Sequence, residues 1–203
     1  MKRQIVFNEL KKHGLAIKEN LKPEVIETMY RYLVFFSHGY VEYDITVTFL
    51  PHLKCTTGHK PTNIRKQMIR LYLNELMRKH MFEGDSRWAK NYHNYQPFSE
   101  FYMEEHTHGA IYRPHLDENI IKEYQYADRK HYHGMMAVHP ELVNKMDELL
   151  GENTLNQFGE GVMTSMVRRV DNIGWVGYMM KEHQKYTDTN LFFGPDLTKN
   201  DGL

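Results

Sequence analysis

The chain has 203 residues, 26 basic and 26 acidic side chains, and 41% hydrophobic residues. This length suits one domain with a substantial core. No apolar run approaches the roughly 20 residues of a membrane span, and no secretory signal is predicted. Zero net charge argues against a dedicated nucleic-acid coat protein. The single cysteine, Cys55, excludes an internal disulfide framework and favours a reducing, intracellular compartment.

The first 50 residues predict helices followed by a strand. Residues 1–40 carry apolar side chains at helical spacing after Pro23, and Gly39 is expected to end the last helix. Residues 43–50 then alternate, with Ile45 on one face of the predicted strand and Thr46 on the other.

Residues 61–80 predict an amphipathic helix whose apolar stripe includes Leu71. Between residues 59 and 80 there are six Lys or Arg side chains against one acid. This basic element is either a solvated helix face or a contact for nucleic-acid phosphates. The DNA-binding candidates here and in a later segment are Arg65, Lys66, Arg70, Arg168 and Arg169.

The second half of the chain predicts strands at 98–105, 131–138 and 161–170. A helix at 140–150 should end at Gly151, and Asp171 is the expected N-cap of a helix around Tyr178. The residues from 186 onwards are expected to be irregular. This order predicts an α+β fold, a mainly antiparallel sheet with helices packed on it.

Two histidines, His131 and His133, begin the strand at 131–138. Because alternate strand residues share a face, both imidazoles should point the same way and could hold a divalent metal. A third ligand is expected from the end of the strand at 98–105, where Glu104 is preferred to Glu105. Such a set suits Mg²⁺ or Mn²⁺, and would also bind Zn²⁺.

A second pair, His106 and His108, is the alternative metal pair, although Gly109 also suits a hairpin turn there. On the predicted helix after residue 171, Tyr178 and Lys181 are three residues apart and share a face. A lysine near a phenol can stabilise developing negative charge. Tyr178 and Lys181 are therefore the catalytic candidates, with Tyr178 as a nucleophile towards phosphate.

Three motifs in this order resemble those of the HUH endonucleases, in particular single-tyrosine rolling-circle replication initiator (Rep) proteins. They are the strand 44–50, His131-Tyr132-His133-Gly134, and Tyr178-Met179-Met180-Lys181. The resemblance implies an N-terminal helical extension at 1–40, an endonuclease domain at 41–186 and an irregular tail at 187–203. It also implies an antiparallel sheet of about five strands, related to the RNA-recognition fold.

The resemblance further implies a nickase whose tyrosine attacks single-stranded DNA at an origin sequence or stem-loop. The products are a 5′-phosphotyrosine link and a free 3′-hydroxyl, and the reverse reaction rejoins strands. The expected cofactor is Mg²⁺ or Mn²⁺. No phosphate-binding loop of a helicase occurs in the sequence, so a further domain or a host helicase is expected. The activity would lie where DNA is replicated, in the cytoplasm of a prokaryotic or archaeal host or the nucleus of a eukaryotic one.

Three other interpretations stay open. A transposase or a relaxase could use the same residues, although relaxases usually carry a third histidine in the motif. A non-enzymatic single-stranded nucleic-acid-binding domain would leave the histidines and Tyr178 as packing residues. A metal hydrolase of another fold is disfavoured by the long predicted helices.

Overall fold

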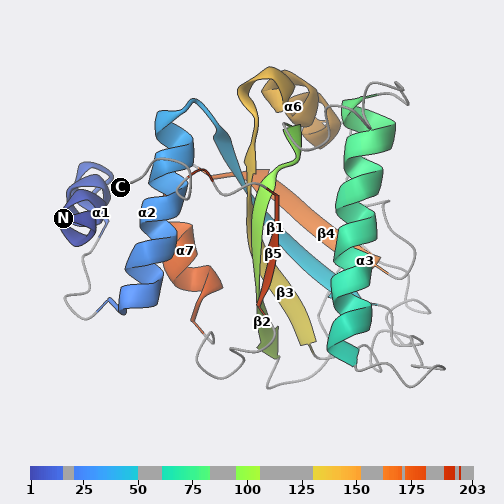
Figure 1. Ribbon diagram of the computed structural model, residues 1–203, viewed down its shortest axis with the longest axis horizontal. Helices are drawn as coiled ribbons and strands as arrows, with labels where there is room; N and C mark the ends of the chain where they lie inside the picture. Colours follow the sequence, from blue (N-terminus) through green and yellow to red (C-terminus); the bar gives the residue numbers. More distant parts are fainter. Residues whose placement is uncertain are drawn as a thin grey trace.

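A five-stranded antiparallel sheet forms the middle layer of the computed structural model (Figure 1). Its strand order is β4-β1-β3-β2-β5, which confirms the predicted α+β fold. The strands are β1 (Val41–Phe49), β2 (Phe98–Glu105), β3 (Lys130–Val138), β4 (Val162–Arg169) and β5 (Leu191–Phe193). The structure describes residues 1–15, 21–49, 61–82, 95–105, 130–151, 162–170, 172–181, 190–194 and 197.

Helices cover both faces of the sheet (Figure 1). One face carries α2 (Pro23–Ser37) and α7 (Gly174–Met179), with α1 (Lys2–Lys12) packed outside α2. The other face carries α3 (Pro61–Glu75), the π-helical turn η1 (Leu76–Met81) and α6 (Val143–Gly151), which follows the 3₁₀ turn η2 (Pro140–Leu142). None of the helices in the described ranges has the length and apolar character needed to cross a bilayer.

The start and end of helix α2 lie where the sequence predicts them. Pro23 occupies the first turn of α2, and Gly39 follows that helix with a φ of 82°, a left-handed conformation that favours glycine. Gly151 is the last residue of α6, so that helix reaches one residue further than predicted. The N-cap of the tyrosine helix α7 is Ile173, so the prediction of Asp171 was wrong; Asp171 itself lies outside the described residues.

Two further expectations from the sequence were wrong. Residues 191–193, predicted to be irregular, form β5 at the sheet edge, because Leu191 and Phe193 are buried while Phe192 is exposed. Three residues are too few to show a periodic pattern in the sequence. Leu71 was placed on the apolar stripe of α3 but is exposed, since Ile69, Tyr72 and Leu76 face the sheet instead.

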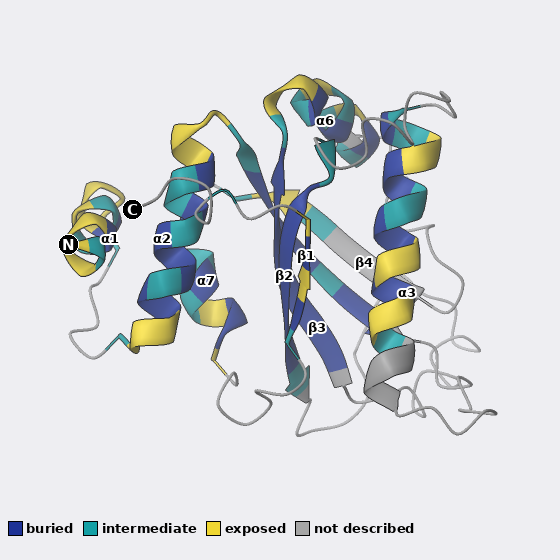
Figure 2. Ribbon diagram, in the orientation of Figure 1, coloured by how far each residue is buried: buried dark blue, intermediate teal, exposed yellow. Residues whose placement is uncertain are grey.

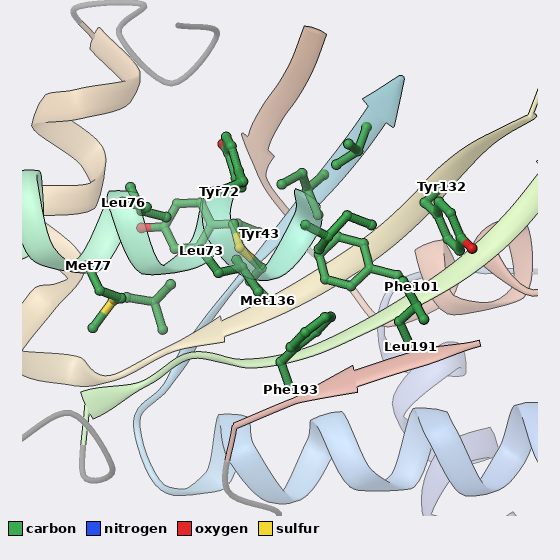
Figure 3. Close-up of a cluster of buried hydrophobic side chains, with 14 of the residues drawn as sticks. Tyr43, Tyr72, Leu73, Leu76, Met77, Phe101, Tyr132, Met136, Leu191 and Phe193 are labelled. Carbon is green, nitrogen blue, oxygen red and sulfur yellow. The ribbon is translucent and has the colours of Figure 1, made fainter. Parts of the chain in front are cut away.

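Both faces of the sheet bury an apolar cluster, and the α2 face also buries several polar side chains. On the α3 side, Tyr132 and Met136 of β3 join Phe101 of β2 in an apolar core (Figure 3). On the α2 side, β3 presents His131 and His133, and Figure 2 shows β3 to be buried along its described side chains. The period of two in β3 therefore places His131 and His133 on the α2 side, the more polar face, beside Met135 and Ala137 and away from the apolar core under α3.

The close approach of Phe101 explains why a glycine, Gly134, follows the histidines. A Cβ there would lie 2.5 Å from Cδ1 of Phe101, the residue that pairs with Gly134 across β2 and β3. The ring of Phe101 thus lies over the backbone of the histidine strand. We conclude that Gly134 serves core packing, while its neighbours serve the polar face.

Helix α2 is held on the polar face by buried hydrogen bonds. Tyr32 donates to the carbonyl oxygen of Met135 over 2.8 Å, and Arg31 forms an ion pair with Glu100. Tyr102 donates to Oε2 of Glu100 over 2.8 Å, and its hydroxyl lies 3.3 Å from Oγ1 of Thr28. Because these groups are buried, their mutual hydrogen bonds fix α2 against the histidine strand.

Glu42 is a buried carboxyl on the same face, and burial raises its pKa from 4.5 to about 8. The folded protein therefore holds a proton there that the unfolded chain releases above pH 4.5, so folding becomes less favourable as pH rises towards 8.

We expect Glu42→Gln to stabilise the protein by about 3 kcal/mol at pH 7. The difference should vanish below pH 4.5. Urea denaturation at several pH values measures it, and Glu148→Gln, an exposed control, should show no such trend.

Candidate metal centre and neighbouring tyrosine

Glu104, His131 and His133 meet on the α2 side of the sheet. Antiparallel pairing places Glu104 of β2 opposite His131 of β3. The two Nε2 atoms lie 3.0 Å apart, and Oε2 of Glu104 lies 2.9 Å from Nε2 of His133 and 3.7 Å from that of His131. Three potential ligand atoms therefore converge from two adjacent strands.

These separations fit a divalent ion. Two ligands at about 2.1 Å from an ion and at right angles to each other lie about 3.0 Å apart. Two of the three observed separations match that value, and the third is 0.7 Å longer. Two imidazoles and one carboxylate on one side of an ion leave other positions open. This buried group could bind a metal ion.

Thr46 adds a contact behind the metal group. It lies opposite His133 in the pairing of β1 with β3, and its Oγ1 is 3.0 Å from Nδ1 of His133. When Nδ1–H of His133 donates a hydrogen bond to the threonine oxygen, the Nε2 lone pair is left facing Glu104 and His131. The sequence placed Thr46 on the polar side of its strand but could not show that His133 is its neighbour.

Thr46→Val should weaken divalent-metal binding by about 10- to 100-fold, because the histidine ring loses the group that orients it. Mn²⁺ titration by calorimetry measures this effect. Thr28→Val, which removes a buried hydroxyl on the same side of the sheet, should leave Mn²⁺ affinity unchanged. Equal affinities for all three proteins would show that Thr46 does not orient His133.

Lys181 links the metal group to the tyrosine. Its Nζ lies 2.6 Å from Oε1 of Glu104 and 4.1 Å from the ring centre of Tyr178. Burial alone would lower the pKa of Lys181, but hydrogen bonds with Glu104 and Tyr178 raise it overall. Burial raises the pKa of Glu104, yet Lys181 and His133 bring it below its usual value. The site therefore holds a charged lysine beside an ionised carboxylate.

Tyr178 lies directly beside the histidines. Its ring centre is 5.1 Å from that of His133, and the side chain is 43% exposed. Trp175, one turn earlier on α7, stacks on Tyr178 with ring centres 4.6 Å apart. The phenol is thus held between an indole and a lysine while part of it stays open to solvent.

Arg168 of β4 contacts both the tryptophan beside Tyr178 and a buried aspartate of β1. Its guanidinium lies 4.9 Å from the ring centre of Trp175, and its Nε donates to Asp44 over 2.6 Å. Burial raises the pKa of Asp44, and the contact with Arg168 opposes that shift. A pocket of 440 Å³ is lined by these side chains and Tyr178. Neither Asp44 nor Trp175 was identified as a site residue from the sequence.

The structure brings only some of the predicted residues together. Arg65, Lys66 and Arg70 lie on α3, on the opposite side of the sheet from the metal group. Arg169 forms an ion pair with Asp147 of α6 over 3.2 Å. The alternative pair His106 and His108, and the side chain of Glu105, lie outside the described part of the chain.

The site therefore combines a buried Glu–His–His group with a tyrosine, a lysine and an arginine–tryptophan pair. Five strand and helix segments contribute to it, namely β1, β2, β3, β4 and α7. Comparison of the chain with models of protein families, with curated proteins and with solved structures gave no match.

Proposed function

We propose that this protein is a metal-dependent endonuclease and strand transferase acting on single-stranded DNA, a replication initiator of the HUH type. The observation that carries this proposal is the position of Tyr178 and Lys181 at the Glu104–His131–His133 group. A phenol beside a metal group and a cation suits attack on a phosphodiester.

In the proposed reaction the phenol oxygen of Tyr178 attacks phosphorus, and the bond from phosphorus to the 3′-oxygen of the preceding nucleotide breaks. The phenol proton ends on that oxygen, which leaves a free 3′-hydroxyl and a 5′-phosphotyrosine link. The released hydroxyl can attack the link in reverse and rejoin the strand. The reaction conserves the number of phosphodiester bonds and therefore needs no nucleotide cofactor.

A divalent ion, Mg²⁺ or Mn²⁺ in this proposal, would neutralise charge on the scissile phosphate when bound by Glu104, His131 and His133. Lys181 would place positive charge next to the attacking oxygen. Trp175 holds the ring of Tyr178 by stacking, which limits its rotation.

A single strand suits the surroundings of the tyrosine. Arg168 supplies a cation for the phosphate backbone, although Asp44 neutralises part of its charge. Tyr178 and Trp175 also line the pocket beside Arg168, and an unpaired base can contact the exposed edges of their rings. A duplex would keep its bases stacked internally and offer only its backbone and the base edges in its grooves.

The test is a denaturing gel of the full chain incubated with a mixed-sequence single-stranded DNA pool. We expect a slowly migrating protein–DNA adduct with Mn²⁺, and its loss in EDTA. An adduct that persists in EDTA would contradict metal-dependent transfer. Strong binding of the pool with no adduct at any metal concentration would favour the non-enzymatic binding domain.

A further inference from the structure

Asp44 is a buried acid beside the site proposed for a polyanionic substrate. It lies on β1, is only 2% exposed, and lines the 440 Å³ pocket that also contains Tyr178. Its Oδ1 has no hydrogen-bond partner among the residues that the structure describes. Burying a carboxylate opposes folding, and a negative charge here repels DNA phosphates. Neither folding stability nor attraction of DNA therefore accounts for this residue.

Asp44 holds the side chain of Arg168 in place. The two residues are direct partners in the pairing of β1 with β4. Nε of Arg168 donates to Oδ2 of Asp44 over 2.6 Å, although the arginine side chain is 57% exposed. An exposed arginine otherwise has many rotamers open to it. Because β1 is an inner strand of the sheet, the carboxylate gives the guanidinium a rigid anchor.

The anchored guanidinium lies over the indole of Trp175. It is 4.9 Å from the ring centre, which is within the range of a cation–π contact. Nε1 of Trp175 is buried and makes no hydrogen bond to the described part of the chain. The orientation of the indole therefore depends on the rings and the guanidinium that pack against it.

Trp175 lies between the proposed nucleophile and the metal group. It stacks on Tyr178 with ring centres 4.6 Å apart and ring planes at 29°. It also meets His133 at right angles, with ring centres 5.9 Å apart. A displacement of about 1 Å can slow a reaction that needs aligned atoms by roughly 100-fold. The indole is therefore placed to fix the direction from which the phenol attacks.

We propose that Asp44 is a positioning residue for the nucleophile Tyr178, acting through Arg168 and Trp175. This role rests on the proposed function, because it assumes that Tyr178 attacks phosphorus. Asp44 fixes the guanidinium, the guanidinium fixes the indole, and the indole fixes the phenol beside the metal group. Loss of the Asp44 charge should therefore slow the reaction without weakening DNA binding.

Asp44→Asn is the first test, because it keeps the shape of the side chain and removes the charge that holds Arg168. Adduct formation with a saturating mixed-sequence single-stranded DNA pool and Mn²⁺ should slow by about 10- to 100-fold. Affinity for the same pool, measured by fluorescence anisotropy in EDTA, should equal or exceed that of wild type. Burial raises the pKa of Asp44, so a neutral amide should not lower stability in urea.

Asp147→Asn is the matched control, because Asp147 also pairs with an arginine of β4. It contacts Arg169 over 3.2 Å from α6, on the other side of the sheet. Its replacement should change neither the rate of adduct formation nor the affinity for DNA.

Arg168→Lys separates positioning from contact with the DNA backbone. Lysine keeps the positive charge but lacks the planar group that lies on an indole while it bonds a carboxylate. The salt dependence of DNA binding should therefore stay as in wild type, while adduct formation slows about as much as in Asp44→Asn. A wild-type rate in Arg168→Lys would show that only the charge of Arg168 matters, and would overturn the inference.

A double-mutant cycle tests whether Asp44 acts through the indole. Trp175→Leu removes the ring on which the guanidinium and the phenol lie, and should slow adduct formation by about 10- to 100-fold. Adding Asp44→Asn to this variant should slow it by less than about 2-fold more, because the link to Tyr178 is already broken. Two full effects that multiply would show that Asp44 acts by another route.

The outcomes separate this inference from the proposed function. A wild-type rate in Asp44→Asn, or a slower rate that follows weaker DNA binding, would overturn the positioning role. In either case the adduct formed by wild type would leave the proposed nuclease activity standing. Absence of any adduct with wild type would overturn both.

Discussion

Tyr178→Phe is expected to abolish covalent adduct formation and to lower strand cleavage by at least about 10⁴-fold. The substitution removes only the attacking oxygen. The ring remains, so its stacking on Trp175 at 4.6 Å and its contact with Lys181 at 4.1 Å should persist. Affinity for single-stranded DNA should therefore stay within a few-fold of wild type. Denaturing gels measure adducts, and anisotropy measures binding.

Tyr40→Phe is the matched control, because it removes a phenol oxygen at a distance from the metal group. Its ring packs against Phe35 and His139 rather than against the histidines of β3. It should form adducts at the wild-type rate. An adduct that survives Tyr178→Phe would move the nucleophile to another residue, and Tyr186 would be examined next.

His131→Ala is expected to weaken Mn²⁺ binding by at least about 100-fold and to remove adduct formation. Loss of a residue that only orients a metal ligand lowers metal affinity by about 10- to 100-fold, and loss of a direct ligand should lower it further. The imidazole is 2% exposed, and its Nε2 lies 3.0 Å from Nε2 of His133, so its loss removes one of the three converging ligand atoms. Calorimetric titration with Mn²⁺ measures the change.

His38→Ala is the control for this substitution. His38 is exposed at the end of α2, where its Nδ1 lies 2.8 Å from the carbonyl oxygen of Val34. Its replacement should leave Mn²⁺ affinity unaltered. Wild-type affinity in His131→Ala, with the fold intact by circular dichroism, would mean that the three side chains do not form the metal site.

The position of the metal group could be predicted because it follows from strand alternation. Two histidines separated by one residue must share a face if they lie on a strand. His131 and His133 do lie on a strand, β3. The same rule allows only one of Glu104 and Glu105 to face the histidines, and Glu104, the preferred residue, lies close to both of them. The choice of a ligand from this segment also assumed that the strand at 98–105 lies beside the histidine strand, and the pairing of β2 with β3 confirms it.

Other features depended on pairings that the sequence does not display. Thr46 became a partner of His133 only through the register between β1 and β3, which spans 87 residues of chain. Arg168 reaches Trp175 because β4 lies beside β1 at the sheet edge. Helix α2 proved to be anchored on the histidine face through Tyr32 and Arg31, a contact between segments about 70 to 100 residues apart.

The most direct measurement maps the covalent link itself. The adduct formed with Mn²⁺ would be digested with nuclease and trypsin, and its peptides analysed by mass spectrometry. The tryptic peptide 170–181 contains Tyr178 as its only tyrosine. We predict that this peptide carries a nucleotide through its 5′-phosphate, while the released strand ends in a 3′-hydroxyl. A nucleotide on any other peptide, or a 3′-phosphate on the released strand, would contradict the proposed mechanism.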